Sequence, residues 1–378
     1  MGPKKRLMFI FGTRPEAIKM APLIAEVEKF NEVFEKVVVV TAQHRDMLDQ
    51  VLKIFSIQPD YDLDIMEESQ GLTTILVKAM QGLEEILIRE KPDMLLVQGD
   101  TSTTFIGSLM GYFYRVPVGH IEAGLRTFDK FRPFPEEMNR RLTSVISDLH
   151  FAPTKRSVFN LLKEGVPPNT VFLTGNTVID ALISVASRPF DLKPLGIDPS
   201  GPPIVLVTAH RRESLGAPMR QICEAIKRIV ANHRGEISVV FPAHKNPQVQ
   251  DVVHEILGSL PEVMITEPLD YEPFVHVMKA ATLILTDSGG VQEEAPSLGK
   301  PVLVMREVTE RPEAIAAGSV KLVGMETDKI VAETEALLTD KAAYDKMAHA
   351  VNPYGDGHAS ERIAEILTRT FKATERPL

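Results

Sequence analysis

The stretch SRPFDLKPLGIDPSGPP, residues 187–203, separates two halves of the chain that have the same pattern. It contains five prolines and two glycines. Proline lacks the amide hydrogen that helices and internal strands require, and glycine leaves the backbone free, so neither element is expected here. We therefore interpret residues 187–203 as a linker. A chain of 378 residues is long enough to build two separate cores.

Short apolar runs alternate with longer helical patterns on both sides of this linker. The strands expected before it are residues 7–11, 37–41, 94–98, 117–121 and 149–152, and those expected after it are 204–208, 237–241, 263–266, 283–286 and 302–305. Such alternation is typical of parallel sheets covered by helices on both faces. The predicted fold class is α/β, with two Rossmann-like doubly wound parallel-sheet domains facing across a cleft.

The domain boundaries follow from this pattern. Residues 1–186 are expected to form an N-terminal domain and residues 204–357 a C-terminal domain. Residues 358–378 contain an amphipathic run without a capping residue of its own. We expect a C-terminal helix there; the sequence leaves open which domain it packs on, with the N-terminal domain as the candidate.

Composition restricts the partners. The formal net charge of -9 provides no broad basic surface, so neither nucleic acid nor a membrane is an expected partner. The single cysteine, Cys223, excludes an intramolecular disulfide framework. No apolar stretch approaches the roughly 20 residues needed to cross a bilayer, and the apolar run at 7–11 is too short for a signal peptide. We expect a soluble, cytoplasmic protein.

Three carboxylates follow successive expected strands of the first half. Asp100 comes after 94–98, Glu122 comes after 117–121, and Glu136 lies where the next loop becomes a helix. The carboxyl ends of parallel strands share one edge of a sheet, where ligands bind, so these side chains are expected to converge and to transfer protons. Arg140, one helical turn after Glu136, would hold a carboxylate in place.

Two strand-to-helix turns offer donors for phosphate. Arg14 and Lys19 follow the first strand and bring positive charge. The stronger candidate follows the strand at 283–286 and consists of Ser288, Gly289 and Gly290, whose backbone amides open a helix. Glu294, one turn further, would accept hydrogen bonds from ribose hydroxyls. The alternative for both sites is an ordinary turn with solvated side chains.

A further polar cluster follows the strand at 204–208. Here His210 precedes two arginines and is a candidate for binding phosphate or sugar, with a simple capping histidine as the alternative. His244, after the strand at 237–241, is a weaker candidate. Neither HExxH nor paired cysteine spacing occurs, so no metal is expected. The chain also lacks GxGxxG and GxxxxGK[ST], which weakens the case for NAD or a Walker-type ATPase.

Eight sequence blocks, taken in order, resemble one known family. They are GTRPEAIKMAPL, VQGDTSTT, GHIEAGLRT, FPEEMNR, TAHRRES, LTDSGGVQEEAPSLGKPVLVMRE, TERPEA and NPYGDGHAS. Over residues 6 to about 366 the chain is similar to the non-hydrolysing UDP-N-acetylglucosamine 2-epimerases. The resemblance implies the glycosyltransferase-B architecture, a homodimer, no cofactor and a role in cell-surface polysaccharide biosynthesis.

The resemblance also implies a reaction. UDP-N-acetylglucosamine is converted reversibly to UDP-N-acetylmannosamine by anti elimination of UDP to 2-acetamidoglucal, followed by re-addition. Acid–base roles would fall on Asp100, Glu122 and Glu136, without a decision as to which is the base, and His210 would serve the diphosphate or sugar. Substrate-binding residues would be Arg14, Lys19, Arg140, Phe274 against uracil, Ser288, Gly289, Gly290, Glu294 and Arg311.

Regulated members of the family bind a second substrate molecule at an adjacent site. Gln43, His44 and His244 match that site, whereas Asp46 and Ser69 depart from it. An acidic Asp46 near a diphosphate, without the arginine that regulated relatives carry at position 69, would repel it. The sequence therefore predicts weakened or absent activation by substrate.

Three other functions remain compatible with the sequence. A glycosyltransferase shares the architecture, and a fold does not determine a function. A hydrolysing 2-epimerase would release UDP and free N-acetylmannosamine, because the intermediate is not joined to UDP again. A non-catalytic sugar-nucleotide sensor is the third alternative, and the complete set of expected carboxylates disfavours it.

Overall fold

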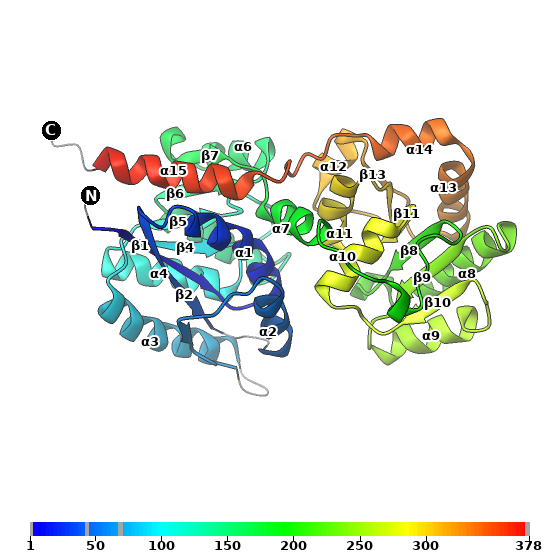
Figure 1. Cartoon of the computed structure of the whole chain (residues 1–378), viewed down its shortest axis with the longest axis horizontal. Coiled ribbons are helices and arrows are strands. Elements are labelled where there is room, and N and C mark those ends of the chain that lie inside the picture. Colours follow the sequence, from blue (N-terminus) through cyan, green and yellow to red (C-terminus); the bar gives the residue numbers. More distant parts are fainter. Residues whose placement is uncertain (1–2, 42–44, 67–70, 375–378) are drawn as a thin grey trace. The chain divides into compact units, whose positions relative to one another are not determined.

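A computed structural model describes residues 3–41, 45–66 and 71–374. The described chain folds into two compact units (Figure 1). The first unit comprises Met1–Ala181 together with Tyr354–Leu378, and the second comprises Leu182–Pro353. Each unit is a parallel sheet with helices on both faces, which confirms the predicted α/β class.

Among the described residues, the first unit contains a seven-stranded sheet in the order β3-β2-β1-β4-β5-β6-β7. Its strands are β1 (Lys5–Phe11), β2 (Phe34–Val40), β3 (Tyr61–Asp62), β4 (Met94–Gln98), β5 (Val118–Ile121), β6 (Leu149–Ala152) and β7 (Val171–Leu173). Its helices are α1 (Arg14–Glu28), α2 (Arg45–Ile54), α3 (Leu72–Glu90), α4 (Ser102–Tyr114), α5 (Glu136–Ile146), α6 (Lys155–Lys163), the start of α7 (Thr177–Ala186), and α15 (Ala359–Thr374). The order reverses between β1 and β4, where ligands bind in doubly wound sheets.

The second unit has a six-stranded sheet in its described part, in the order β10-β9-β8-β11-β12-β13. Its strands are β8 (Ile204–Thr208), β9 (Ser238–Pro242), β10 (Val263–Thr266), β11 (Leu283–Thr286), β12 (Val302–Val304) and β13 (Val320–Leu322). Its helices are α8 (Ala217–Asn232), α9 (Pro247–Leu257), α10 (Tyr271–Ala280), α11 (Gly289–Glu294), α12 (Pro312–Ala317), α13 (Thr327–Thr339) and α14 (Lys341–Ala348). Within the described ranges, no helix has the length and apolar character needed to cross a membrane.

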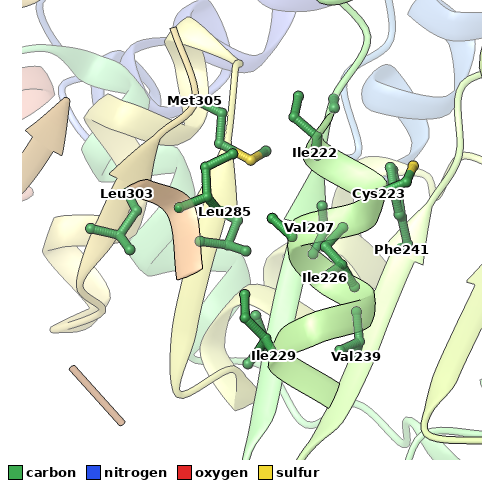
Figure 2. Close-up of a cluster of buried hydrophobic side chains, with 14 of the residues drawn as sticks. Val207, Ile222, Cys223, Ile226, Ile229, Val239, Phe241, Leu285, Leu303 and Met305 are labelled. Atoms are coloured by element: carbon green, nitrogen blue, oxygen red, sulfur yellow. The ribbon is translucent and has the colours of Figure 1, made fainter. Parts of the chain in front are cut away.

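Helix α8 illustrates how the core of the second unit is built. Its apolar residues recur at helical spacing, so Ile222, Ile226 and Ile229 face the sheet (Figure 2). They pack with Val207 of β8 and Phe241 of β9, and all of these side chains are buried. The helical spacing of the apolar residues of α8 thus places their side chains against the strands.

The proline-rich segment 187–203 packs on the second unit. Phe190 stacks on His276 of α10 with ring centroids 4.8 Å apart, and Leu192 and Ile197 are buried. Helix α7, which precedes the segment, contains the boundary between the units. The burial of Leu192 and Ile197 agrees with the division of the structure, which assigns this segment to the second unit, whereas the sequence indicated a linker between the domains.

The C-terminal helix α15 belongs to the first unit and contacts α1 (Figure 1). The sequence shows no cap for this helix, but Asp180 supplies one from a distant part of the chain. Its carboxylate accepts hydrogen bonds from the backbone N–H groups of Ala359, at 3.2 Å, and Ser360, at 2.7 Å. Two orphan donors at the helix start are thereby satisfied.

Replacing Asp180 with alanine should destabilise the start of α15. Loss of an N-cap typically costs about 1–2 kcal/mol, and both N–H groups are buried here. We expect faster amide hydrogen exchange over residues 359–374, measured by mass spectrometry. Asp340→Ala, which removes a local and exposed cap from α14, is the matched control and should leave α15 unchanged. Equal exchange of α15 in wild type and Asp180→Ala would contradict the assignment.

Candidate active site

Acidic side chains gather at the carboxyl edge of the first sheet. Asp100 follows β4 and Glu122 follows β5, and these strands pair in parallel. Glu136 is the first residue of α5. Burial raises the pKa of Asp100, the cation of Arg140 lowers it, and the charges of Glu122 and Glu136 raise it further. The carboxylates are thus close enough to influence one another, as the strand order predicts.

Arg140 holds the Asp100 side chain in place. Its Nη2 lies 2.7 Å from Oδ2 of Asp100, and its Nη1 lies 3.4 Å from Oε2 of the buried Glu137. The Nδ2 of Asn139 donates to the Asp100 backbone carbonyl at 3.0 Å. The Asp100 side chain keeps 27% of its surface exposed, so it is fixed by its partners and still reachable from solvent.

Glu122 is bound more tightly, and its side chain is only 6% exposed. Lys19 Nζ donates to both carboxylate oxygens, at 2.6 and 2.7 Å. Gln98 Nε2 donates at 2.5 Å and Asn176 Nδ2 at 2.8 Å. These donors favour the ionised carboxylate. The residue also has a φ of 64°, a left-handed conformation that non-glycine residues adopt at a cost and that concentrates at functional sites.

Glu16 supports the turn that carries Arg14. This buried carboxylate accepts the backbone N–H of Gly12 at 3.0 Å and of Thr13 at 2.8 Å. It also accepts the hydroxyl of Thr101 at 2.5 Å, directly after Asp100. Burial raises the pKa of Glu16, and the hydroxyl and amide donors lower it. The turn after β1 and the loop after β4 are therefore joined through one side chain.

In the second unit, Arg311 lies against Gly289, the first residue of α11. A Cβ built on Gly289 would lie 2.6 Å from Nη1 of Arg311, so the guanidinium occupies the space that a side chain would need. Arg311 Nε donates to Glu293 at 2.5 Å. Ser288 is the N-cap residue of α11. The predicted phosphate-binding turn and the predicted arginine are therefore brought together.

The predicted ribose-binding residue, Glu294, has a partner that the sequence did not reveal. Tyr271 donates its hydroxyl to Oε2 of Glu294 at 3.2 Å. Burial raises the pKa of Tyr271 well above its usual value, and the charge of Glu294 adds to this. Tyr271 opens α10, and Phe274, the predicted uracil contact, lies one turn further and is half-buried.

A charge network joins the loops after β8 and β12. The buried Arg306 donates to Glu213 at 2.5 Å and to Glu310 at 3.0 Å. Burial opposes ionisation of Glu310, but the hydrogen bond from Arg306 and the nearby cations lower its pKa to about 2. Arg211 lies 3.8 Å from Glu310. This network holds cations in place next to His210.

His210 follows β8 and is paired with two groups. Its Nδ1 lies 3.3 Å from Oδ1 of Asp287, and its ring stacks on that of His244 with centroids 6.0 Å apart. The structure thus brings together two histidines that the sequence analysis placed in separate sites. Gln43, His44, Ser69 and the side chain of Asp46 lie outside the described residues.

The structure also changes the expected surroundings of Lys19, which pairs with Glu122 and so belongs to the carboxylate cluster. The supporting residues Gln98, Asn176, Tyr271 and Asp287 were not assigned roles from sequence, because each acts on a neighbour far away in the chain. Asp287 lies inside the glycine-turn motif, and that position was the one signal available for it.

Among the described residues, no group of histidine, cysteine and acidic side chains could hold a metal ion.

Solved structures with similar folds define the class of protein. The glycotransferase of kitacinnamycin matches with a TM-score of 0.66 at 10% identity, over 97% of this chain and 99% of that one. A crystal structure of a Listeria monocytogenes protein matches with a TM-score of 0.93 at 48% identity, over 99% of both chains. Together with the presence of two doubly wound units, these similarities define a protein of the glycosyltransferase-B fold.

The family follows from sequence comparisons. The family model for UDP-N-acetylglucosamine 2-epimerase matches residues 26–368. A UDP-N-acetylglucosamine 2-epimerase of Yersinia pestis is 52% identical over 96% of this chain and 98% of its own length. A Neisseria meningitidis UDP-GlcNAc 2-epimerase, crystallised with UDP-GlcNAc, is 48% identical with a TM-score of 0.86, over 96% of this chain and 100% of that one. The chain belongs to the UDP-N-acetylglucosamine 2-epimerase family.

Proposed function

We propose that the protein catalyses the reversible C2 epimerisation of UDP-N-acetylglucosamine to UDP-N-acetylmannosamine without net hydrolysis. The observation that carries the proposal is the carboxylate cluster, in which Asp100 has a raised pKa beside the tightly bound Glu122. Family membership and the Neisseria meningitidis relative crystallised with UDP-GlcNAc support the same substrate.

The chemistry requires both an acid–base group and a leaving-group site. The proton on C2 has no adjacent carbonyl, so a carboxylate cannot remove it by simple enolisation near neutral pH. Anti elimination of UDP to 2-acetamidoglucal makes the step feasible, and re-addition of UDP after protonation of the other face gives the epimer. Cations and amides stabilise the charge that develops on the departing diphosphate.

The residues divide between these two tasks. In the first unit, burial raises the pKa of Asp100, which makes this carboxyl a better proton donor and acceptor for general acid–base catalysis than an ordinary aspartate. Glu122 and Glu136 complete the acid–base set, and Arg14 adds a cation near the start of α1. In the second unit, the turn at residues 288–290 with Arg311 binds phosphate, Glu294 binds ribose, Phe274 packs on uracil, and His210 serves the leaving group. No cofactor is needed for this route.

Product analysis distinguishes the proposal from its alternatives. Purified protein is incubated with UDP-N-acetylglucosamine, and the products are separated by anion-exchange chromatography and identified by phosphorus NMR. We expect an equilibrium mixture of the two UDP-sugars with little free UDP. Stoichiometric UDP with free N-acetylmannosamine would indicate the hydrolysing reaction, and sugar transfer to an added acceptor would indicate a transferase. Tight binding without turnover would indicate a sensor.

Activation by a second substrate molecule is predicted to be weak or absent. The departures at Asp46 and Ser69 from the regulated pattern support this prediction. Initial rates should follow a hyperbola as the concentration of UDP-N-acetylglucosamine rises. In the reverse direction, UDP-N-acetylmannosamine alone should react without a lag or a requirement for added UDP-N-acetylglucosamine. A strongly sigmoidal curve would contradict the prediction.

A homodimer is also proposed. Helices α4 and α5 contact each other and carry large apolar side chains that are exposed in the single chain. These side chains are Tyr112, Phe113, Leu142 and Val145. Exposed apolar groups of this kind commonly mark protein interfaces. Light scattering on the purified protein should give twice the mass of 41.9 kDa.

A further inference from the structure

His210 and Asp287 form a side-chain pair beyond two neighbouring strands. Strands β8 and β11 pair in parallel, and the two residues follow their carboxyl ends. Asp287 is completely buried, whereas the His210 side chain is 44% exposed. The imidazole therefore has one side against a buried carboxylate and another side accessible from solvent.

The two oxygens of Asp287 have different surroundings. Oδ2 accepts hydrogen bonds from the backbone N–H of His210, the backbone N–H of Arg211 and the hydroxyl of Ser214, each at 2.8 Å. Oδ1 is buried and makes no hydrogen bond of ordinary geometry among the described residues. A buried carboxylate oxygen without a donor is costly. His210 Nδ1, 3.3 Å away, needs only a small ring movement to donate to it.

We propose that Asp287 is a positioning residue for His210. Its Oδ1 accepts the Nδ1–H, which fixes the tautomer of the neutral ring and leaves Nε2, across the ring, directed away from the carboxylate. The same carboxylate stabilises the imidazolium form when Nε2 is protonated. This inference rests on the proposed function. The protonated ring then presents a charged Nε2–H donor where the negative charge of departing UDP develops.

The surroundings of His210 fit an anion as the partner of Nε2. His244 stacks on the ring, and Arg211 follows directly in the chain. Arg211 also belongs to the charge network of Glu310 and Arg306. Oδ1 of Asp287 lies 3.3 Å from Nδ1 of the His210 ring. With the Asp287 carboxylate accepting from Nδ1, a phosphate oxygen that accepts from Nε2 would give each ring nitrogen a negatively charged partner.

Asp287→Asn tests this arrangement because asparagine has the same shape. Its carbonyl oxygen can keep accepting from the 210–214 loop, and its NH₂ group then faces Nδ1 and forces the proton onto Nε2. We expect kcat for epimerisation to fall by about 100-fold or more with little change in KM, because the neutral amide cannot stabilise the imidazolium that donates to departing UDP. Ser214→Ala is the matched control, since it removes one loop donor to Oδ2 and leaves the contact with the ring.

The direct readout is the His210 tautomer in the full-length protein labelled with ¹⁵N-histidine. Long-range ¹H–¹⁵N NMR spectra at a pH where the ring is neutral distinguish Nδ1–H from Nε2–H, and His210→Gln identifies the signals. Wild type and Ser214→Ala should show Nδ1–H, and Asp287→Asn should show Nε2–H. In a His210→Gln background, Asp287→Asn should cause little further loss of kcat.

Each outcome decides the question. An Nε2–H tautomer in wild type, or an unchanged tautomer in Asp287→Asn, overturns the proposal, and the wild-type spectrum suffices even where the variant fails to fold. Equal losses of kcat in Asp287→Asn and Ser214→Ala would show that Asp287 only fixes the loop. A tautomer that depends on Asp287 in a protein without epimerase activity supports the pairing and contradicts the proposed function alone.

Discussion

Asp100→Asn should lower kcat for epimerisation by about 10²- to 10⁴-fold, the range for loss of a general acid–base group. Asparagine keeps the shape of Asp100 and can still accept from Arg140, which lies 2.7 Å from the carboxylate. It cannot exchange a proton. Burial already disfavours the charge on Asp100, and Arg140 keeps a second carboxylate partner in Glu137 at 3.4 Å, so the substitution should change the unfolding temperature little. Initial rates and thermal unfolding of the same preparation measure both effects.

Asp148→Asn is the matched control for this substitution. Asp148 accepts the backbone N–H of Val118 at 2.8 Å, at the beginning of the strand that ends near Glu122. The same chemical change is thus made at the opposite edge of the same sheet, and kcat should remain within about twofold of wild type. An Asp100→Asn variant as active as Asp148→Asn would remove Asp100 from the acid–base set.

Glu122→Gln should reduce both stability and activity. The neutral side chain leaves the Lys19 ammonium, which is 16% exposed, without its counter-charge. It also directs an NH₂ group toward the donors of Gln98 or Asn176. Breaking one side of a buried ion pair typically costs about 3–5 kcal/mol. We expect a lower midpoint in urea unfolding and a loss of kcat greater than the unfolded fraction explains.

Glu164→Gln separates these two effects. Glu164 pairs with Arg126, whose side chain is fully buried, at 2.7 Å, and neither residue belongs to the carboxylate cluster. This variant should lose stability and retain the kcat of wild type at a temperature where it is folded. Unchanged stability in Glu122→Gln would show that Lys19 has another adequate partner, and unchanged kcat would limit Glu122 to a structural role.

The central strands could be predicted from the sequence, whereas three edge strands could not. The buried run of β1 is continuous and apolar because a central parallel strand is covered on both faces. Strands β3, β7 and β13 lie at sheet edges, have two or three residues each, and carry exposed or half-buried side chains. A run of two or three residues is too short to show an alternation of polar and apolar side chains or a continuous apolar stretch. Such a strand is defined by its pairing with a neighbouring strand.

Long-range contacts explain the other differences in the fold. The abundance of proline at residues 187–203 correctly excluded regular structure apart from one 3₁₀ turn (Lys193–Leu195), but it carried no information about packing on α10. The cap of α15 comes from Asp180, 179 residues before the Ala359 amide that it accepts. Local sequence rules describe neighbours in the chain, so they do not detect a cap of this kind.

In the candidate site, too, the positions that follow from the strand order could be predicted, whereas long-range partners could not. The positions of Asp100 and Glu122 after neighbouring strands predicted that they would lie close together, and they do. Their partners were harder to predict. Lys19 of α1 donates to Glu122, a partner that the sequence did not indicate, because the two residues are 103 positions apart in the chain. Asn176 reaches Glu122 across 54 positions of sequence.

The measurement that tests the central claim most directly is proton NMR of the wild-type protein with UDP-N-acetylglucosamine in deuterium oxide. Elimination and re-addition predict deuterium at C2 in both UDP-N-acetylglucosamine and UDP-N-acetylmannosamine, with little free UDP accumulating. Formation of UDP-N-acetylmannosamine that retains its original C2 proton, or release of one UDP for each sugar converted, would contradict the account.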